Sequence, residues 1–533
     1  MAGIGWRLER LMHQGVSGAA AAYTTGAAVM ALPWVLTTAV LVTLPAVIGR
    51  GMADVTAKTA VNVAYAVALL VSGPVQIVIS RYAADRLYEG RLGEIAAPFC
   101  RGLGATFLIC AGPAALVLLA LDLPLRTALW GAALSAAVGA QWTALSVGNG
   151  LCSPALVLGA VGAGAAQSFF LAALLVAVAG LGVPGYLFGL ISGQTLTLVI
   201  LLAGIFRALP HEGNEKAPLW PAFHDYAMLA GAGFAFNASL WVDKLVAWCL
   251  VGGQTAALHA GASTLAWFSS IPCLAWIFVE VETTFHRRFR RFYLALESGA
   301  SLSELRRGVR ALGDEALRLL RGAISVQAGV TIFLQLAAEP CARWLDVPSS
   351  AILPYRLLLV GAGAQALGLL GLILLYYFDL GREACLAAAC LLLGVAAFTL
   401  AASASGLPPS VGTALGCVLG AVMTWRRVFR GVSAVLQDTL LGQPLVAKHK
   451  GNPGSRTRTL VVRGNHAASF EDSNGRRKED RLGPAAAIDA GGRDPVRASH
   501  AGYSPVAESM KHLIPRPVLG PDERPAPPRS AAP

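Results

Sequence analysis

Long apolar segments recur along most of the chain, and they constrain its fold more than any single motif does. A membrane-spanning helix needs about 20 mostly apolar residues. We expect such helices at 26–48, 58–80, 103–121, 125–148, 155–180, 184–206, 226–251, 261–281, 322–339, 353–378, 383–403 and 407–425. The sequence therefore predicts an all-α fold, a polytopic transmembrane helix bundle of about 12 spans.

The composition supports this prediction and excludes a soluble enzyme. Hydrophobic residues make up 55% of the chain and charged residues only 14%, against roughly 25% charged residues in ordinary globular proteins. Most of the surface is therefore expected to face lipid. The net charge of +12 does not indicate nucleic acid as a partner, because the basic residues lie between apolar segments and near the C-terminus rather than along one face.

The segments between the predicted helices differ strongly in positive charge. With the N-terminus in the cytoplasm, the cytoplasmic segments before the tail hold 18 Arg and Lys residues, and the opposite segments hold 5. Cytoplasmic loops of membrane proteins carry an excess of Lys and Arg. Both termini are therefore predicted to be cytoplasmic.

A weak internal repeat predicts two halves of six helices each. The second predicted helix contains Ser-Gly-Pro at 72–74, the eighth contains Ser-Ile-Pro at 270–272, and each leads into a basic segment. Transporters are often built from such repeats, with the substrate path between them. We expect an N-terminal half over 1–206 and a C-terminal half over 207–430. Beyond them, 442–533 lacks apolar periodicity and is predicted to be a disordered cytoplasmic tail.

The basic loop at 282–321 is the largest predicted cytoplasmic loop. Aromatic residues recur there at helical spacing, with arginines between them. Amphipathic basic helices can lie on an anionic membrane surface or bind a partner. The alternative is a positive anchor that only fixes the topology. The candidate docking residues are Phe285, Arg287, Arg288, Phe289, Arg290 and Arg291.

Motifs for common enzymatic chemistry are missing from the sequence. It contains no GxxxxGK[ST] phosphate loop, no HExxH zinc motif and no Gly-x-Ser-x-Gly elbow. The nine cysteines include no CxxC pair, which argues against a zinc site. Glu280 and Glu282 have the spacing of an acidic metal-binding pair, but they end a predicted helix, so we expect ion pairs with nearby arginines. We predict no catalytic residue, no cofactor and no metal site.

Two adjacent charges in the seventh predicted helix, Asp243 and Lys244, are the strongest candidates for a function. A charge at the centre of a membrane helix costs roughly 2.5 to 3.5 kcal/mol on insertion scales. Adjacent side chains point about 100° apart on a helix, so each is expected to meet its own partner or a wet cavity. The alternative is a position near the periplasmic interface, with Lys244 extending out to water.

Several amides inside the predicted spans could line a polar path with this pair. Such groups suit a hydroxyl-rich cargo, although hydrogen bonds between helices are the ordinary alternative. The candidates for the substrate path are Asp243, Lys244, Asn237, Gln141, Gln194 and Gln365.

Five blocks of the sequence resemble the PelG family. They are MAGIGWRLERL at 1–11, SGPVQIVISRYAADRLYEGRL at 72–92, SLWVDKLVAW at 239–248, FVEVETTFHRRFRRFY at 278–293 and LLYYFD at 374–379. The blocks occur in order over roughly the first 430 residues. The long segment after residue 442 departs from the family pattern, which leaves its role open.

The resemblance implies a component of the Pel exopolysaccharide machinery in the bacterial inner membrane, similar to polysaccharide flippases of the multidrug/oligosaccharidyl-lipid/polysaccharide exporter (MOP) superfamily. It implies transport of Pel, a galactosamine-rich polymer, from the cytoplasm to the periplasm for the biofilm matrix. The implied partners are the lipid bilayer, the membrane proteins PelD and PelE, and the glycosyltransferase PelF. The resemblance assigns no role to Asp243 or Lys244, which lie in one of the matching blocks.

The residues leave three functions open. A transporter would have a polar path between two halves, and an ion gradient or polymer growth would drive it. A membrane-embedded glycosyltransferase or polymerase would need catalytic acids at a membrane face, and the loops contain few acids. A scaffold that does not transport would only anchor the assembly.

Overall fold

A computed structural model describes residues 8–48, 55–210, 219–344 and 348–442, with three short segments beyond them. The N-terminal half contains α2 (Gly15–Ile48), α3 (Val55–Tyr88), the 3-10 turn η2 (Leu92–Glu94), α4 (Ala96–Ala120), α5 (Leu125–Leu151), α6 (Pro154–Ala173), the π-turn η3 (Leu174–Val178) and α7 (Gly182–Ala208). The helix α8 (Leu219–Asp225) leads into the C-terminal half.

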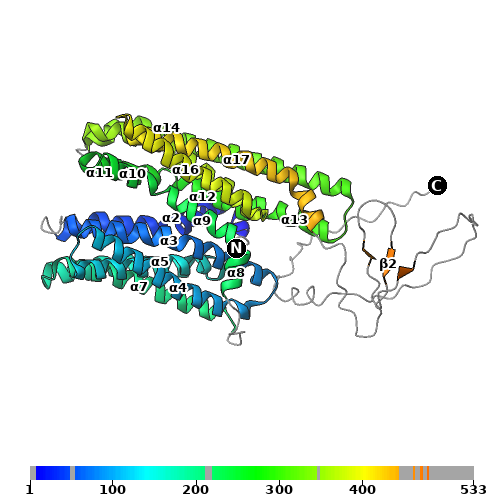
Figure 1. Cartoon of the computed structure of the whole chain (residues 1–533), viewed down its shortest axis with the longest axis horizontal. Helices are drawn as coiled ribbons and strands as arrows, with labels where there is room; N and C mark the ends of the chain where they lie inside the picture. The colour runs from blue at the N-terminus through cyan, green and yellow to red at the C-terminus, as the bar shows by residue number, and fades with distance from the viewer. Residues whose placement is uncertain are drawn as a thin grey trace, which may run out of the picture. The chain divides into compact units, whose positions relative to one another are not determined.

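The C-terminal half contains α9 (Ala227–Ser239), α10 (Val242–Leu250), α11 (Gly253–Phe268), α12 (Ile271–Glu280), the π-turn η4 (Val281–Phe285), α13 (His286–Glu297), α14 (Leu302–Trp344), the 3-10 turn η5 (Ser349–Ala351), α15 (Ile352–Tyr377), α16 (Gly381–Ala404) and α17 (Pro409–Gly442). Figure 1 shows the long helices running side by side, with α2, α3, α9 and α12 in the middle.

Nine helical segments among the described residues are long and apolar enough to cross a membrane. The predicted all-α transmembrane bundle is therefore confirmed. The other three predicted spans, 125–148, 226–251 and 407–425, are also helical and correspond to α5, to α9 with α10, and to α17. The count of twelve spans and their orientation stay predictions.

The helix α5 is largely enclosed by other helices. It packs against α3, α4 and α7, and most of its buried residues are Ala, Gly, Ser or Thr. Small residues allow membrane helices to approach closely. A helix enclosed in this way does not need the large apolar side chains that lipid-facing helices carry.

The pairs of helices that pack together in the N-terminal half have counterparts six spans later in the C-terminal half. In the N-terminal half, α2 packs against α6, α3 against α5, and α4 against α5. The corresponding pairs in the C-terminal half, α9 with α16, α11 with α15, and α14 with α15, are also in contact. The main contacts between the halves are α2 with α12 and α3 with α9. They follow the same rule, because moving six spans along from α2 leads to α9, and moving six spans back from α12 leads to α3. A duplicated half would produce this pattern, so we retain the two-half division as a proposal.

The seventh and eighth predicted spans are each broken into two helices. The seventh is interrupted at Leu240 and Trp241, between α9 and α10. The eighth is interrupted at Ser269 and Ser270, and Pro272 lies in the first turn of the following α12. A proline in the first turn begins a helix well but cannot continue one from before it, because it lacks an N–H group.

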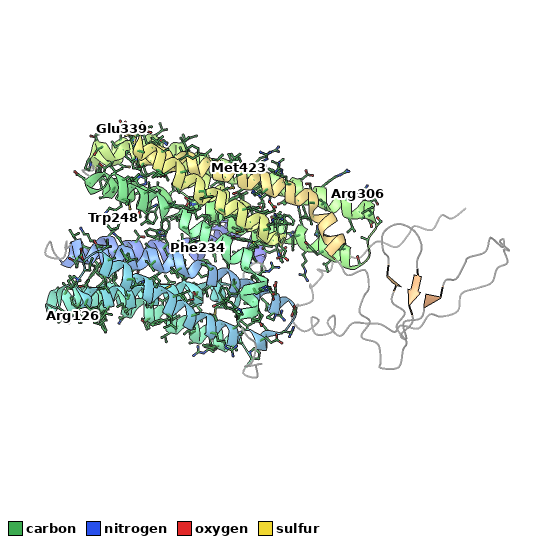
Figure 2. All side chains as sticks on the ribbon, viewed as in Figure 1. Arg126, Phe234, Trp248, Arg306, Glu339 and Met423 are labelled. Atoms are coloured by element: carbon green, nitrogen blue, oxygen red, sulfur yellow. The ribbon has the colours of Figure 1, made fainter. Side chains whose placement is uncertain are left out.

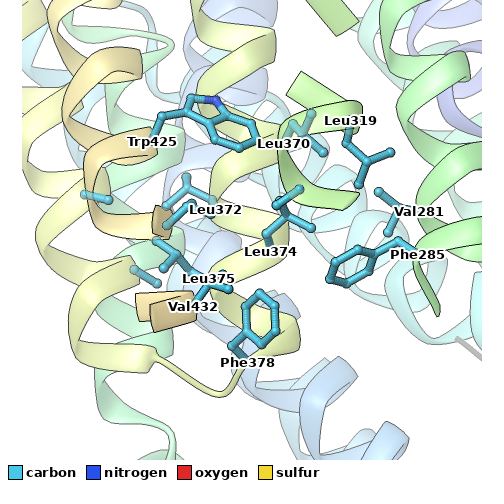
Figure 3. Close-up of a cluster of buried hydrophobic side chains, with 14 of the residues drawn as sticks. Val281, Phe285, Leu319, Leu370, Leu372, Leu374, Leu375, Phe378, Trp425 and Val432 are labelled. Atoms are coloured by element: carbon cyan, nitrogen blue, oxygen red, sulfur yellow. The ribbon is translucent and has the colours of Figure 1, made fainter. Parts of the chain in front are cut away.

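The structure corrects one predicted docking residue, Phe285. Its side chain is fully buried in the largest apolar cluster of the C-terminal half, where Figure 3 shows it beside Phe378. The Phe285 ring packs edge-on against the rings of Tyr377 and Phe378, with centroids 5.4 and 5.9 Å away. Phe285 therefore belongs to the core that joins η4 to the end of α15 and is not available to a partner.

The basic segment 282–321 is mostly helical, as the spacing of its aromatic and apolar residues predicts. The helix α13 continues α12 through η4, and α14 runs without a break from Leu302 through the predicted ninth span. With 43 residues, α14 is roughly 65 Å long, about twice the hydrocarbon thickness of a bilayer. Figure 2 places Arg306 at one end of the bundle and Glu339 at the other. A helix of this length exceeds the hydrocarbon thickness, so we expect its arginine-rich end to lie outside it; a position on an anionic leaflet and docking of a partner both stay predictions.

The predicted disordered tail, 442–533, lies outside the described residues except for Gly442 and three short strands. These strands are β1 (Leu460–Val461), β2 (Ser469–Glu471) and β3 (Arg477–Lys478), and they pair antiparallel in the order β1-β2-β3. They belong to a second unit that begins at Gln437.

A glycine in α6 provides a test of the helix packing. A Cβ atom at Gly164 would lie 2.5 Å from the backbone oxygen of Gly193 in α7, whereas a Cβ at Gly162 would meet nothing within 4 Å. Overpacking of this kind costs about 1 to 3 kcal/mol. We expect Gly164→Ala to lower the melting temperature in detergent and Gly162→Ala to leave it unchanged or raise it. Equal melting temperatures for the two variants would contradict the α6–α7 packing.

Candidate functional site

The break between α9 and α10 determines where the Asp243 and Lys244 charges lie. Asp243 is in the first turn of α10, where the helix dipole stabilises a negative charge. The Lys244 N–H donates to the Trp241 carbonyl at 3.1 Å, and the Lys244 ammonium donates to the Leu240 carbonyl at 2.8 Å. The lysine side chain therefore supplies a hydrogen bond to a carbonyl at the helix break.

Asp243 is part of a buried cluster of three titratable side chains. The Lys244 ammonium lies 2.9 and 3.1 Å from the two carboxylate oxygens of Asp243. Nε2 of His259 in α11 lies 3.0 Å from Asp243 Oδ2. Asp243 and His259 are each only 1% exposed. The carboxylate is thus matched by two nitrogen groups, as a buried charge requires.

In this cluster Asp243 meets a partner from another helix, His259, and both charged side chains line a cavity; the two charges also pair with each other. The two side chains meet because the long Lys244 side chain folds back toward the helix break. The third member, His259, was missed because the sequence placed it in a loop between spans, whereas α11 already begins at Gly253. Its Nδ1 atom is buried and has no hydrogen-bond partner within the described part of the chain.

A small cavity, with room for about one water molecule, adjoins this cluster inside the C-terminal half. Asp243, Lys244 and the predicted residue Gln365 line it. Nε2 of Gln365 donates to Ser239 Oγ at 3.0 Å, which joins α15 to α9. The cavity is therefore polar, and its charges compensate one another.

A second cavity, also with room for about one water molecule, lies inside the N-terminal half. It is lined by the predicted residues Gln141 and Gln194, with Thr37 and Tyr65. Nε2 of Gln194 donates to the Tyr65 hydroxyl at 3.0 Å. Oε1 of Gln141 is buried without a hydrogen-bond partner among the described residues. All the residues that line this cavity are uncharged.

The predicted residue Asn237 lies in neither cavity lining. Its amide donates to the backbone carbonyl of Leu69 at 2.7 Å, which ties α9 to α3 across the two halves. Gly73 makes room for it, since a Cβ atom there would overlap the Asn237 amide. For Asn237, the structure thus shows the alternative reading, a hydrogen bond between helices.

A charged network joins the two halves at one end. The Tyr23 hydroxyl of α2 donates to Glu280 Oε1 of α12 at 2.8 Å. Glu280 Oε2 lies 2.7 Å from Arg318 Nη2 of α14, which confirms the predicted ion pair at the helix end. Glu282 instead accepts a hydrogen bond from the Tyr377 hydroxyl at 3.3 Å.

Two further polar contacts join the halves at the same end. Arg81 of α3 pairs with Asp379 at 3.3 Å, and Tyr226 donates to Asp85 at 2.6 Å. In contrast, α10 and α11, the other segments of the two broken spans, pack mainly against α16 and α15 of their own half. The halves are therefore held together chiefly through α9 and α12, at the end predicted to face the cytoplasm.

The predicted docking arginines of α13 are all exposed. Arg287 lies 3.3 Å from Glu9, and Arg288 lies 3.1 Å from the buried carboxylate of Glu315. Phe289 is half-buried, and its ring centroid is 5.4 Å from that of Tyr377. The arginines thus remain available on the surface, whereas the aromatic residues contribute to the core.

A comparison with known protein families identifies the family of this chain. A family model described as "PelG: Putative exopolysaccharide Exporter (EPS-E)" matches residues 1–439. The chain belongs to the PelG family. The resemblance predicted from the five sequence blocks is therefore confirmed. No curated protein matches the chain.

Solved structures of MATE transporters share this fold. A mutant of the Vibrio cholerae MATE transporter VcmN has a TM-score of 0.59 and 15% identity, over 83% of this chain and 100% of that chain. An outward-facing MATE family transporter of the MOP superfamily has a TM-score of 0.57 and 12% identity, over 77% and 96%. An inward-facing one has 0.52 and 13%, over 78% and 95%. Family and fold together point to a multi-pass membrane transport protein.

Charge compensation in the buried cluster can be tested by removing one charge or both. Asp243→Asn leaves Lys244 without its counter-ion, and breaking a buried pair costs about 3 kcal/mol or more. We expect a clear fall in the melting temperature of this variant. The double variant Asp243→Asn with Lys244→Met should recover most of it, because it leaves no unpaired charge. A single variant as stable as the original chain would contradict the buried pair.

Proposed function

We propose that this chain moves Pel, a galactosamine-rich exopolysaccharide, across the bacterial inner membrane from the cytoplasm to the periplasm, where it enters the biofilm matrix. Membership of an exopolysaccharide-exporter family supports the class of cargo. The excess of Arg and Lys in the predicted cytoplasmic segments supports the orientation.

The observation that carries this proposal is a group of polar side chains around a small cavity inside each half of an otherwise apolar bundle. Sugar hydroxyls both donate and accept hydrogen bonds, and amide and hydroxyl side chains match them. Gln141 and Gln194 supply such groups in the N-terminal half, and Gln365 supplies them in the C-terminal half. These residues, with Asp243 and Lys244, are our candidates for the path.

Alternating access is the mode of transport that fits the contacts between the halves. The two halves are joined chiefly through α2 with α12 and α3 with α9, at the predicted cytoplasmic end. Rocking of one half against the other would open that end and close the opposite one. In this conformation the periplasmic end would be the open one.

Export by the purified chain tests the transport role directly. The stable double variant Asp243→Asn with Lys244→Met should export labelled polymer from vesicles about tenfold more slowly or worse, a change equivalent to about 1.4 kcal/mol of barrier. Assembly with its partners should remain intact. A scaffold that does not transport would give no export even for the original chain, and normal export by the variant would remove both residues from the path.

A membrane-embedded glycosyltransferase remains the alternative function. Such an enzyme would join labelled sugar from a nucleotide sugar to an acceptor without any other protein. We expect no product from the purified chain in vesicles. Incorporation of label into polymer would overturn the transport proposal in favour of synthesis.

Docking of the synthase is proposed on the exposed arginines of α13, with PelF as the binding partner and PelD and PelE as neighbours in the membrane. We expect Arg290→Glu with Arg291→Glu to reduce co-purification with PelF several-fold, because the reversed charges would repel an acidic surface. Arg126→Glu, at the opposite end of the bundle in Figure 2, is the control. Equal co-purification of all variants would end the docking proposal.

A further inference from the structure

A helical hairpin made of α13 and residues 302–321 of α14 forms what we call the arginine stalk. The ring of Phe292 in α13 packs where Gly308 of α14 leaves room for it. Val432 of α17 lies beside Gly313 on α14, so a third helix supports the hairpin. Three packed helices make the stalk a firm element that can transmit a displacement.

The surface of the arginine stalk is strongly positive. Its exposed arginines are Arg287, Arg288, Arg290, Arg291, Arg306, Arg307, Arg310, Arg318 and Arg321. The exposed acids described on the same helices are Glu304, which bonds to Ser301 in the preceding turn, and Asp314. Because α14 continues directly into a span, we expect the stalk to project away from the bilayer rather than lie along it. Charge complementarity therefore favours a protein with an acidic surface as its occupant.

One arginine of this surface connects to the contact between the halves through a chain of charges. Arg288 Nη1, on the surface of the stalk, lies 3.1 Å from Glu315 Oε2. The Glu315 side chain is completely buried, and its Oε1 accepts from Arg318 Nε at 2.9 Å. Arg318 Nη2 lies 2.7 Å from Glu280, which accepts the hydrogen bond of Tyr23 from the other half.

We propose that an acidic protein binds the arginine stalk and, by drawing Arg288 away from Glu315, loosens the contact between the halves at Tyr23. A buried carboxylate needs compensation, so Glu315 would then hold the Arg318 guanidinium alone and draw it from Glu280. Glu280 would lose the cation that positions it to accept from Tyr23. This regulation rests on the proposed function, because it matters only if the halves move during transport.

Hydrogen exchange of the chain in nanodiscs tests the relay without any partner. We expect Glu315→Gln to slow backbone exchange in the first turns of α2 about fivefold, because without the competing carboxylate Arg318 pairs with Glu280 alone, although Glu315 lies in α14 and Tyr23 lies in α2. The adjacent exposed acid gives the matched control, and Asp314→Asn should leave α2 unchanged. Equal exchange in both variants would overturn the relay.

A second pair of variants covers the case in which Glu315→Gln does not fold. Arg288→Gln removes only the surface end of the relay, and Arg291→Gln removes a neighbouring exposed arginine. Arg288→Gln should speed exchange in α2, whereas Arg291→Gln should not. If neither variant, or both equally, changed the exchange of α2, the proposed route through Arg288 would be wrong.

Poly-L-glutamate serves as the probe for an acidic protein. Added to the original chain, it should speed exchange in the first turns of α2, and Arg288→Gln should abolish that response. No response, or the same response from anionic lipid in the nanodisc without the probe, would overturn the proposal for a protein partner. Polymer export from vesicles is measured separately. If α2 exchange did not respond to these variants but export were normal, only this inference would be wrong. If α2 exchange responded but the chain exported no polymer, only the proposed function would be wrong.

Discussion

The hydrocarbon interior of a bilayer offers no hydrogen-bond partners, and this constraint explains where the polar groups of the chain lie. Each charge inside the bundle for which we describe a role is paired with a group from another helix or a neighbouring turn. Asp243 has Lys244 and His259, and Glu280 has Arg318 and Tyr23. Where a helix is broken at Leu240, a side chain supplies the missing hydrogen bond. At this break, the buried charges and the carbonyl freed by the break thus help to satisfy one another.

The same helix breaks determine which segments of the C-terminal half contact the N-terminal half. The segments α9 and α12 pack against the N-terminal half, whereas α10 and α11 pack mainly within their own half, although Phe268 at the end of α11 stacks on Trp34 of α2. If the seventh or eighth span were one continuous helix, its whole length would pack either against the other half or within its own half. The breaks allow one part of each span to join the halves while the other part packs mainly within its own half, an arrangement that the proposed alternating access can use.

The sequence predicts well what depends on one segment and poorly what depends on two. Apolar segments long enough to span a bilayer were recognisable, and so was the ion pair of Glu280, because an acid at a helix end beside a basic segment needs a partner. The contact of His259 with Asp243 joins two spans, and no single segment reveals it. Phe285 shares the spacing of an amphipathic stripe, but only packing against α15 shows that it is buried. The amides were found as candidates, yet their division between two cavities and one contact needed the folded chain.

A reversible cross-link between the halves tests most directly whether they must move for cargo to pass. Gly26 in α2 faces Val279 in α12 across the contact, since a Cβ atom at Gly26 would lie 2.9 Å from Val279 Cγ2. The pair Gly26→Cys and Val279→Cys should form a disulfide on oxidation, with each single variant as the control. The account predicts that oxidation stops polymer export from vesicles and that a reductant restores it. Undiminished export by fully cross-linked protein would contradict it.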